Sequence, residues 1–320
     1  MNFSSEIIAE ELRIFETRFK DSVKSNVPLI DRIMRYIVKT KGKQMRPMFV
    51  LLSAKLSGTN NESTYRAASL VELLHTASLV HDDVVDEAME RRGFFSVYAL
   101  WKAKASVLVG DYLLAKGMLL CLDNDDFRIL QIMSRAVKEM SEGELLQLEK
   151  ARSLNLDEEL YYRIIRHKTA SLLASACAAG AYSTSRNEDT TEKMRKFGEL
   201  VGVAFQIKDD LFDYGNDDVG KPTGNDIREK KLTLPLIYTI NHADPAVRRE
   251  LIFILKNQNK KQHKIDQVIE IVKKSGGISY AVSKMNSFRD EALALLGDFE
   301  DGSTKETLVK LVNFTTDRKK

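Results

Sequence analysis

Apolar positions recur along most of the chain three or four residues apart, which is the spacing of an α-helix. Within Glu62–Glu90, for example, Val71, Leu74 and Val85 follow this spacing and predict one long helix. Strict alternation of apolar and polar residues, which would indicate strands, is nearly absent. The pattern therefore predicts an all-α protein.

Helix-start signals divide the pattern into elements. Asn or Asp followed three residues later by Glu forms a capping box, and this signal predicts helices over about 155–181 and 189–215. Pro47 fits the first turn of another helix. Only 232–240 resembles a strand, and Pro235 within it argues against a central strand because proline lacks the N–H that a sheet needs.

Composition limits the architecture and the class of partner. The chain has 320 residues, and its 5 Pro and 16 Gly form no linker, so we expect a single domain over 1–320. Hydrophobic residues make up 43%, enough for a large core. A net charge of +3 gives no reason to expect nucleic acid as a partner.

Localisation follows from two further features. Cys121 and Cys177 lie in apolar helical stretches, as reduced core thiols of a cytoplasmic protein do. The N-terminus shows no secretory signal, and no unbroken apolar run reaches the roughly 18 residues of a spanning helix. We expect a cytoplasmic protein with no stable membrane insertion.

An acidic cluster stands near the end of the long predicted helix. It consists of Asp82, Asp83 and Asp86, and the first and last of these share a helix face, with Cβ atoms about 5–6 Å apart. Like charges at this spacing repel, and the negative end of the helix dipole adds to the repulsion, so a bridging cation is expected. Carboxylate oxygens suit Mg²⁺, which completes its shell with water and phosphate oxygens.

Arg91 and Arg92 follow this cluster. Taken alone, the acidic cluster is as readily an exposed turn at a helix end as a metal site. Paired guanidinium groups bind diphosphate oxygens well, so the two arginines favour a site for a metal-bound diphosphate.

The arrangement recurs in a second cluster, formed by Asp209, Asp210 and Asp213. Gln206 precedes Asp209 by one helical turn. Downstream, glycines and a proline predict a loop that brings Lys221 and Lys231 over a phosphate. Two acidic clusters, each followed by basic residues, are hard to explain as solvated surface.

With these motifs the chain resembles the trans-type polyprenyl diphosphate synthases, which make farnesyl, geranylgeranyl and octaprenyl diphosphates. The resemblance covers nearly the whole chain. Besides the two clusters, it rests on Lys41-Gly42-Lys43-Gln44-Met45-Arg46-Pro47, His75, Arg91-Arg92, Gly110-Asp111-Tyr112-Leu113, Lys168-Thr169, Phe205-Gln206 and Leu234-Pro235-Leu236. Asn225 and Leu232 depart from it, because the family usually has Gly and Pro there.

The resemblance implies an isoprenoid synthase-type orthogonal helical bundle around a central cavity. It also implies an alkyl transferase that condenses isopentenyl diphosphate head to tail onto an allylic diphosphate. A trinuclear Mg²⁺ cluster would lie between the two motifs, held by Asp82, Asp83, Asp86, Asp209 and Asp213. The ions would neutralise the diphosphate as its bond to carbon breaks.

The same resemblance assigns the other site residues. Those expected to take part in catalysis are Asp82, Asp86, Arg91, Lys168, Gln206 and Asp209. Positive charge near the allylic diphosphate would come from Arg91, Lys168, Lys208 or Lys221, and Lys231, with neutral hydrogen bonds from Thr169 and Gln206. Isopentenyl diphosphate would bind without metal to Lys43, Arg46, His75 and Arg92. In the family the released diphosphate takes the proton, so no separate base is expected.

His75 alone would read as an ordinary core histidine. It falls, however, on one helix face with Ser78, Asp82 and Asp86, which favours contact with a ligand.

Product length depends on the helix turn below Asp82. Short-chain members of the family have bulky aromatic residues at the positions of Ala77 and Ser78. Small side chains there predict an open tunnel and a heptaprenyl to decaprenyl product. The tunnel floor would lie deeper, at Leu70, Leu74 or Met133, although an ordinary core stripe would look the same.

Other functions remain open at this stage. A short-chain farnesyl or geranylgeranyl synthase would differ only in the origin of its tunnel floor. A terpene cyclase would replace the second cluster with a mixed metal motif, and a catalytically silent partner subunit would tolerate lost aspartates or arginines. The resemblance also implies a homodimer.

Overall fold

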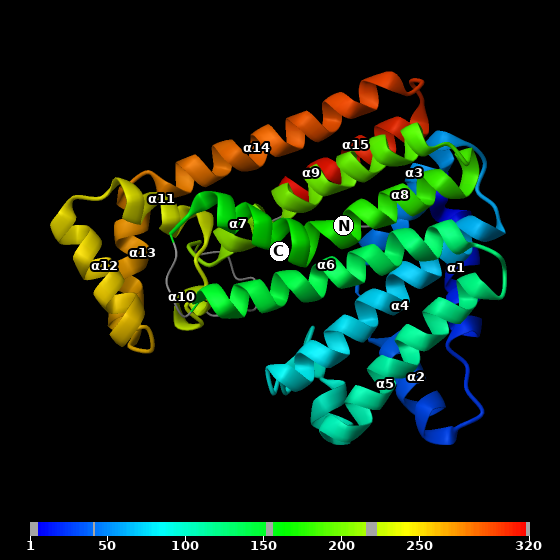
Figure 1. Cartoon of the computed structure of the whole chain (residues 1–320), viewed down its shortest axis with the longest axis horizontal. Coiled ribbons are helices and arrows are strands. Elements are labelled where there is room, and N and C mark those ends of the chain that lie inside the picture. Colours follow the sequence, from blue (N-terminus) through cyan, green and yellow to red (C-terminus); the bar gives the residue numbers. More distant parts are fainter. Residues whose placement is uncertain (1–5, 41, 152–155, 216–222, 318–320) are drawn as a thin grey trace. The chain divides into compact units, whose positions relative to one another are not determined.

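The computed structural model describes residues 6–40, 42–151, 156–215 and 223–317, and helices dominate it (Figure 1). The helices of the first half are α1 (Ala9–Ser22), α2 (Pro28–Lys39), α3 (Met45–Ser57), α4 (Glu62–Val85), α5 (Val97–Leu122) and α6 (Phe127–Ala151), preceded by the 3₁₀ turn η1 (Glu6–Ile8). A two-stranded hairpin, β1 (Glu90–Arg91) and β2 (Phe94–Phe95), separates α4 from α5. The predicted all-α class is confirmed.

The second half continues in the same way. Its elements are α7 (Glu158–Ile165), the π-helical turn η2 (Arg166–Ala170), α8 (Ser171–Ser185), α9 (Glu188–Phe212), α10 (Asn225–Arg228), α11 (Leu234–His242), α12 (Pro245–Asn257), α13 (Gln262–Lys274), α14 (Gly277–Leu295), η3 (Leu296–Asp298) and α15 (Ser303–Asp317).

The chain forms two compact units. The first contains residues 1–137, 175–195 and 299–308, and the second contains 138–174, 196–298 and 309–320. The single domain expected over 1–320 stays a prediction.

The core of the first unit surrounds α4, which packs against α1, α3 and α5. Asn61 begins this helix as its side chain accepts a hydrogen bond from the Thr64 backbone at 3.2 Å, while the Thr64 hydroxyl accepts one from the Asn61 backbone. Such a capping box contributes about 1 kcal/mol. The helix ends at Val85 rather than near residue 90, because the chain turns into the hairpin there.

Two sequence expectations, both of helix N-caps, are corrected. The N-caps of α7 and α9 are Asp157 and Asn187, whose side chains accept from the backbone N–H groups of Glu159 and Thr190. These residues lie two positions from the expected caps at 155 and 189, and residue 155 itself is outside the described ranges. The strand-like stretch 232–240 instead contains most of α11, because Pro235 is tolerated in the first turn of a helix.

The helix α5 is, within the described residues, long and apolar enough to cross a membrane, with a mean hydropathy of 1.6 in its most apolar part. Asp111 and Lys116 interrupt its apolar residues, so the sequence has no unbroken apolar run there. One face of α5 packs on α4, and Gly110 permits this approach, since a Cβ there would lie 2.1 Å from the His81 ring. About a third of the most apolar part of α5 is buried in this way.

The second unit has two apolar clusters. One gathers Tyr161, Ile165, Ile207 and Ile237 with residues of α14, and it supports the ends of α7 and α9. The other joins α11, α12 and α13, which lie next to one another in Figure 1 (yellow to orange). The first of these clusters positions the second acidic motif.

Candidate active site

The first acidic cluster lies at the C-terminal end of α4. Asp82 and Asp86 are exposed one turn apart, whereas Asp83 is buried with 3% of its surface accessible. The two exposed carboxylates therefore share one face, as the spacing predicted, and Asp83 lies on another.

Asp83 forms an ion pair with Arg91. The Nε and one terminal nitrogen of the guanidinium donate to the same carboxylate oxygen at 2.8 and 2.5 Å. Burial raises the pKa of Asp83, and Arg91 opposes that shift. The pair attaches β1 to the end of α4. A role of Asp83 as a metal ligand and of Arg91 as a diphosphate ligand stays a prediction.

Three of the residues predicted to bind isopentenyl diphosphate lie together in the first unit. One terminal nitrogen of Arg46 lies 2.9 Å from Nε2 of His75. The Arg92 guanidinium lies against Gly42, where a Cβ would approach it to 2.5 Å. Lys43, next to Gly42, is exposed. The structure thus brings Arg46, His75 and Arg92 close to one another.

This basic group has a neutral histidine. Arginine only donates, so Nε2 of His75 must be an unprotonated acceptor. Burial lowers the pKa of His75 well below its ordinary value, and Arg46 and Arg92 lower it further. Burial also lowers the pKa of Arg46 to about 10. Nε of Arg46 is buried and has no hydrogen-bond partner among the described residues, as expected of a group that awaits an anion.

The predicted chain-length residues lie on a different face of α4 from the cavity found in the first unit. That cavity includes Arg91 and Arg92 but neither Ala77 nor Ser78, and the α4 residues that line it are Glu72, Thr76, Leu79, Val80 and Asp83. Ala77 is fully buried, and the Ser78 hydroxyl donates to the backbone oxygen of His75 at 2.9 Å. Leu70, Leu74 and Met133 are buried in the same core. Their role as a tunnel floor stays a prediction.

The second acidic cluster lies at the C-terminal end of α9 and differs from the first. Asp209 is exposed, whereas Asp210 and Asp213 are 7% and 8% accessible. Only one of its three carboxylates therefore faces solvent.

Asp213 holds the start of α10. One of its carboxylate oxygens accepts a hydrogen bond from the Asn225 backbone N–H at 2.7 Å, and its other oxygen is buried without a partner among the described residues. Burial raises the pKa of Asp213, while backbone N–H groups around Asn225 oppose the shift. The predicted loop lysine, Lys221, lies outside the described residues.

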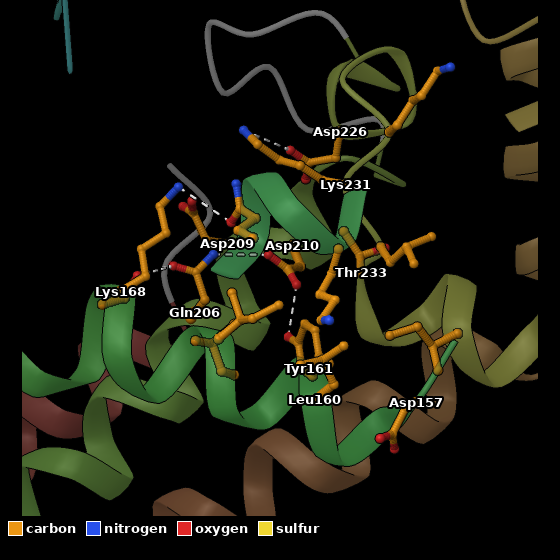
Figure 2. A pocket seen from close by; sticks show the side chains of 18 residues that line it. Asp157, Leu160, Tyr161, Lys168, Gln206, Asp209, Asp210, Asp226, Lys231 and Thr233 are labelled. Carbon is orange, nitrogen blue, oxygen red and sulfur yellow. Dashed lines mark hydrogen bonds and ion pairs between the residues drawn. The ribbon is translucent and has the colours of Figure 1, made fainter. Parts of the chain in front are cut away.

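Asp210 takes part in a chain of hydrogen bonds with the two predicted neutral ligands. Thr169 donates to the Gln206 amide oxygen at 2.9 Å. The Gln206 amide nitrogen donates to Asp210 at 2.9 Å, and the Tyr161 hydroxyl donates to Asp210 at 2.8 Å (Figure 2). Burial raises the pKa of Asp210 to about 8 and that of Tyr161 well above its ordinary value. Sequence reasoning missed Tyr161.

These groups line a cavity of the second unit with a volume of about 220 Å³. Lys168 and Lys231, both predicted ligands, also line it, as do Asp209 and Asp226 (Figure 2). The Lys168 ammonium lies 2.6 Å from a carboxylate oxygen of Glu144, and the Lys231 ammonium forms an ion pair with Glu229. Burial, with help from Asp213, raises the pKa of Asp226 to about 6. Lys208 does not line the cavity, and its ammonium lies 5.2 Å from the centre of the Phe212 ring.

The comparisons agree with this geometry. The family model for polyprenyl synthetases matches residues 27–272, which include both acidic clusters. The chain belongs to the polyprenyl synthetase family. It is therefore a transferase.

Three relatives place this polyprenyl synthetase within its family. Octaprenyl diphosphate synthase of Escherichia coli is 32% identical over 98% of both chains. A polyprenyl synthase of Caulobacter crescentus, solved with calcium and isoprenyl diphosphate, has a TM-score of 0.90 at 32% identity, with 98% of this chain and 97% of that one covered. A geranylgeranyl pyrophosphate synthase of Bacteroides thetaiotaomicron has a TM-score of 0.84 at 37% identity, covering 99% and 98%. The fold class is thereby confirmed.

The π-helical turn η2 is a feature of this synthetase that the sequence did not reveal. It carries Lys168 and Thr169. A Cβ at Gly143 of α6 would lie 2.7 Å from the Lys168 backbone nitrogen, and one at Gly202 of α9 would lie 2.6 Å from Cα of Ala170. Close approach on both sides thus accommodates the widened turn, a form often found at functional sites.

The acidic residues fit magnesium better than a metal held by protein alone. Within the described ranges, no three His, Cys, Asp or Glu side chains converge as a ready-made metal site. Mg²⁺ typically takes one or two carboxylates and leaves the rest of its shell to water and phosphate oxygens. Asp82 and Asp86, exposed one turn apart, and Asp209 match that requirement.

Proposed function

We propose that the chain condenses isopentenyl diphosphate head to tail onto an allylic diphosphate in a magnesium-dependent reaction. One observation carries this proposal. In the first unit, the exposed pair Asp82 and Asp86 stands at the end of α4, and Arg92 of the attached hairpin belongs to the basic group with Arg46. Carboxylates can bind a diphosphate through a metal ion, whereas guanidinium groups can bind a diphosphate directly.

The basic group would hold isopentenyl diphosphate directly. Arg46 and Arg92 offer planar forks of N–H donors, and Lys43 adds a third charge. Because His75 is neutral and accepts from Arg46, it orients one guanidinium without adding a fourth charge. Such direct contacts would fix the double bond that attacks the allylic carbon.

The aspartates would hold the allylic diphosphate through Mg²⁺. Three ions, carried by Asp82, Asp83, Asp86, Asp209 and Asp213, would neutralise the diphosphate as its carbon–oxygen bond breaks. Lys168, Lys221 and Lys231 would add positive charge, and Thr169 and Gln206 would lie at the reacting carbon. The calcium and isoprenyl diphosphate of the Caulobacter crescentus relative support this assignment.

The product is proposed to be long, from heptaprenyl to decaprenyl. Small side chains at Ala77 and Ser78, and a relative that makes octaprenyl diphosphate, support this length. The geranylgeranyl pyrophosphate synthase relative favours the alternative of a short product.

The test is elongation by the purified chain with Mg²⁺, labelled isopentenyl diphosphate and farnesyl diphosphate, with products sized by chromatography. We expect a product of heptaprenyl length or longer.

Ser78→Phe should shorten this product by several units, because the ring would fill the space below Asp82. Leu79→Phe is the matched control, since Leu79 lines the cavity of the first unit that does not include Ser78. Equal lengths from wild type and Ser78→Phe would contradict the tunnel assignment.

The same assay separates the remaining alternatives. Elongation by this chain alone excludes a silent partner subunit, and release of linear diphosphates rather than cyclic hydrocarbons excludes a terpene cyclase. Absence of elongation with every allylic starter would contradict the proposed function.

We further propose that the chain acts as a cytoplasmic homodimer. The side of α5 away from α4 exposes several large apolar residues, among them Val107, Leu108, Met118, Leu119 and Leu122. An apolar stripe of this kind is typical of a surface covered by a partner, and a second copy of α5 would match it.

A further inference from the structure

A continuous chain of four polar side chains runs through the floor of the cavity in the second unit. It starts at Thr169 on η2. It then passes through Gln206 and Asp210 on α9 and ends at Tyr161 on α7 (Figure 2). Its three hydrogen bonds are 2.8–2.9 Å long. All four residues line the cavity, and Figure 2 shows Tyr161 and Gln206 reaching the Asp210 carboxylate from different sides.

The donors and acceptors along this chain set the orientation of the Gln206 amide. Gln206 donates its NH₂ group to one carboxylate oxygen of Asp210 and Tyr161 donates to the other, and both bonds favour the charged carboxylate against the effect of burial on its pKa. The amide oxygen then accepts from Thr169. One N–H of Gln206 remains, with no acceptor among the described residues, and it belongs to a side chain that lines the cavity.

Asp210 in turn depends on Tyr161. The carboxylate is nearly inaccessible, and a buried carboxylate needs donors to remain an acceptor for Gln206. Tyr161 supplies one such donor from a fixed position. The residue is 5% accessible, and its ring packs edge-on against that of Tyr162 with 5.4 Å between the ring centroids. The Tyr161 hydroxyl therefore donates to the same carboxylate that accepts from Gln206.

We infer that Tyr161 is a positioning residue, which acts through Asp210 to hold the Gln206 amide in the orientation needed at the reacting carbon. This inference rests on the proposed function for its kinetic consequence and on the hydrogen-bond chain for its geometry. It also separates Asp210 from its neighbour Asp209, since Asp210 would orient a side chain rather than bind metal.

Tyr161→Phe tests the inference because it keeps the ring and removes only the hydroxyl. We expect kcat to fall roughly 10-fold while KM for both diphosphates changes less than about 2-fold, since the charged ligands are untouched. Tyr162→Phe is the matched control, because its hydroxyl lies outside the chain, and it should keep the wild-type kcat. Thermal unfolding of both variants shows whether either loss reflects instability.

Asp210→Asn provides a second test, because it changes the residue that contacts Gln206 directly. An amide at 210 can donate to Gln206, which lets the Gln206 amide turn over and present its oxygen to the cavity. We expect a kcat loss of about 100-fold, and the double variant Tyr161→Phe/Asp210→Asn should lose no more than Asp210→Asn alone. A wild-type kcat for Tyr161→Phe, or losses that multiply in the double variant, would overturn the inference.

A spectroscopic readout keeps this test separate from the proposed function. In protein labelled with ¹⁵N-glutamine, the Gln206 side-chain NH₂ signals should shift and exchange faster with water in Tyr161→Phe but not in Tyr162→Phe. Unchanged signals would overturn the inference whatever the activity. If the signals shift while the wild type makes no polyprenyl product, the proposed function fails and the orienting role of Tyr161 stands.

Discussion

The two acidic clusters are nearly identical as sequences, yet their environments differ. At the end of α4, Asp82 and Asp86 are exposed, and the buried Asp83 is matched by a full positive charge on Arg91. At the end of α9 only Asp209 is exposed. Its buried companions Asp210 and Asp213 are held by neutral donors, namely a tyrosine, a glutamine and a backbone N–H.

This difference shows that the motif alone does not assign a role to each aspartate. A carboxylate that faces solvent can reach a metal ion with little rearrangement, whereas the buried carboxylates of Asp83 and Asp213 would have to move. Among the five proposed metal ligands, we therefore expect Asp82, Asp86 and Asp209 to contribute most to activity. The following variants test that division of roles.

The largest effect is expected for an exposed aspartate. Asp86→Asn should reduce kcat/KM by about 10³-fold with little change in thermal stability, because it removes charge where the leaving diphosphate gains it. Asp213→Asn, the same change in the second cluster, should reduce kcat/KM by less than about 10-fold. Steady-state kinetics with Mg²⁺ measures both. Equal losses from the two variants would mean that the motif positions are equivalent after all.

A smaller effect, on stability, is expected at the ion pair of the first cluster. Arg91→Ala leaves the Asp83 carboxylate buried without its counter-charge and should cost about 3 kcal/mol in the free energy of unfolding. Asp83→Ala should cost less, since the Arg91 side chain is 37% exposed and can rehydrate. Urea unfolding measures both, with the exposed Arg92→Ala as control. If Arg91→Ala matched the control, the pair would have no structural role.

The smallest effect concerns protonation of His75. Its pKa is lowered in the folded state, so below about pH 6.5 the unfolded chain binds a proton that the folded chain does not, and stability is lost as pH falls. Between pH 7.5 and 5.5 wild type should lose about 1 kcal/mol relative to His75→Gln, which keeps an acceptor for Arg46. A difference that does not vary with pH would show that His75 is not held neutral.

Much of the fold and site follows from local sequence. The capping residue Asn61 and helical spacing define α4, so the position of Asp82 and Asp86 on one exposed face could be predicted. The structure also brings together Arg46 with His75, and Thr169 with Gln206, as expected of residues assigned to common sites.

Other features have no local signal. The pair Asp83–Arg91 depends on a hairpin whose strands have two residues each, too short for any alternating pattern. Tyr161 reads as a core residue of an apolar helix, and its partner Asp210 lies 49 residues away. The turn η2 is closely approached by Gly143 and Gly202, which lie in neighbouring helices far from it in the sequence. These features arise from tertiary packing.

A double-mutant cycle tests most directly whether the two clusters serve one metal-bound diphosphate. Asp86→Glu and Asp209→Glu keep the charge and displace each carboxylate by one methylene, so the activity stays measurable. With Mg²⁺, the loss of kcat/KM in the double variant should fall far short of the product of the single losses if, as proposed, both residues act on the same ions. Losses that simply multiply would show two independent sites and contradict the account.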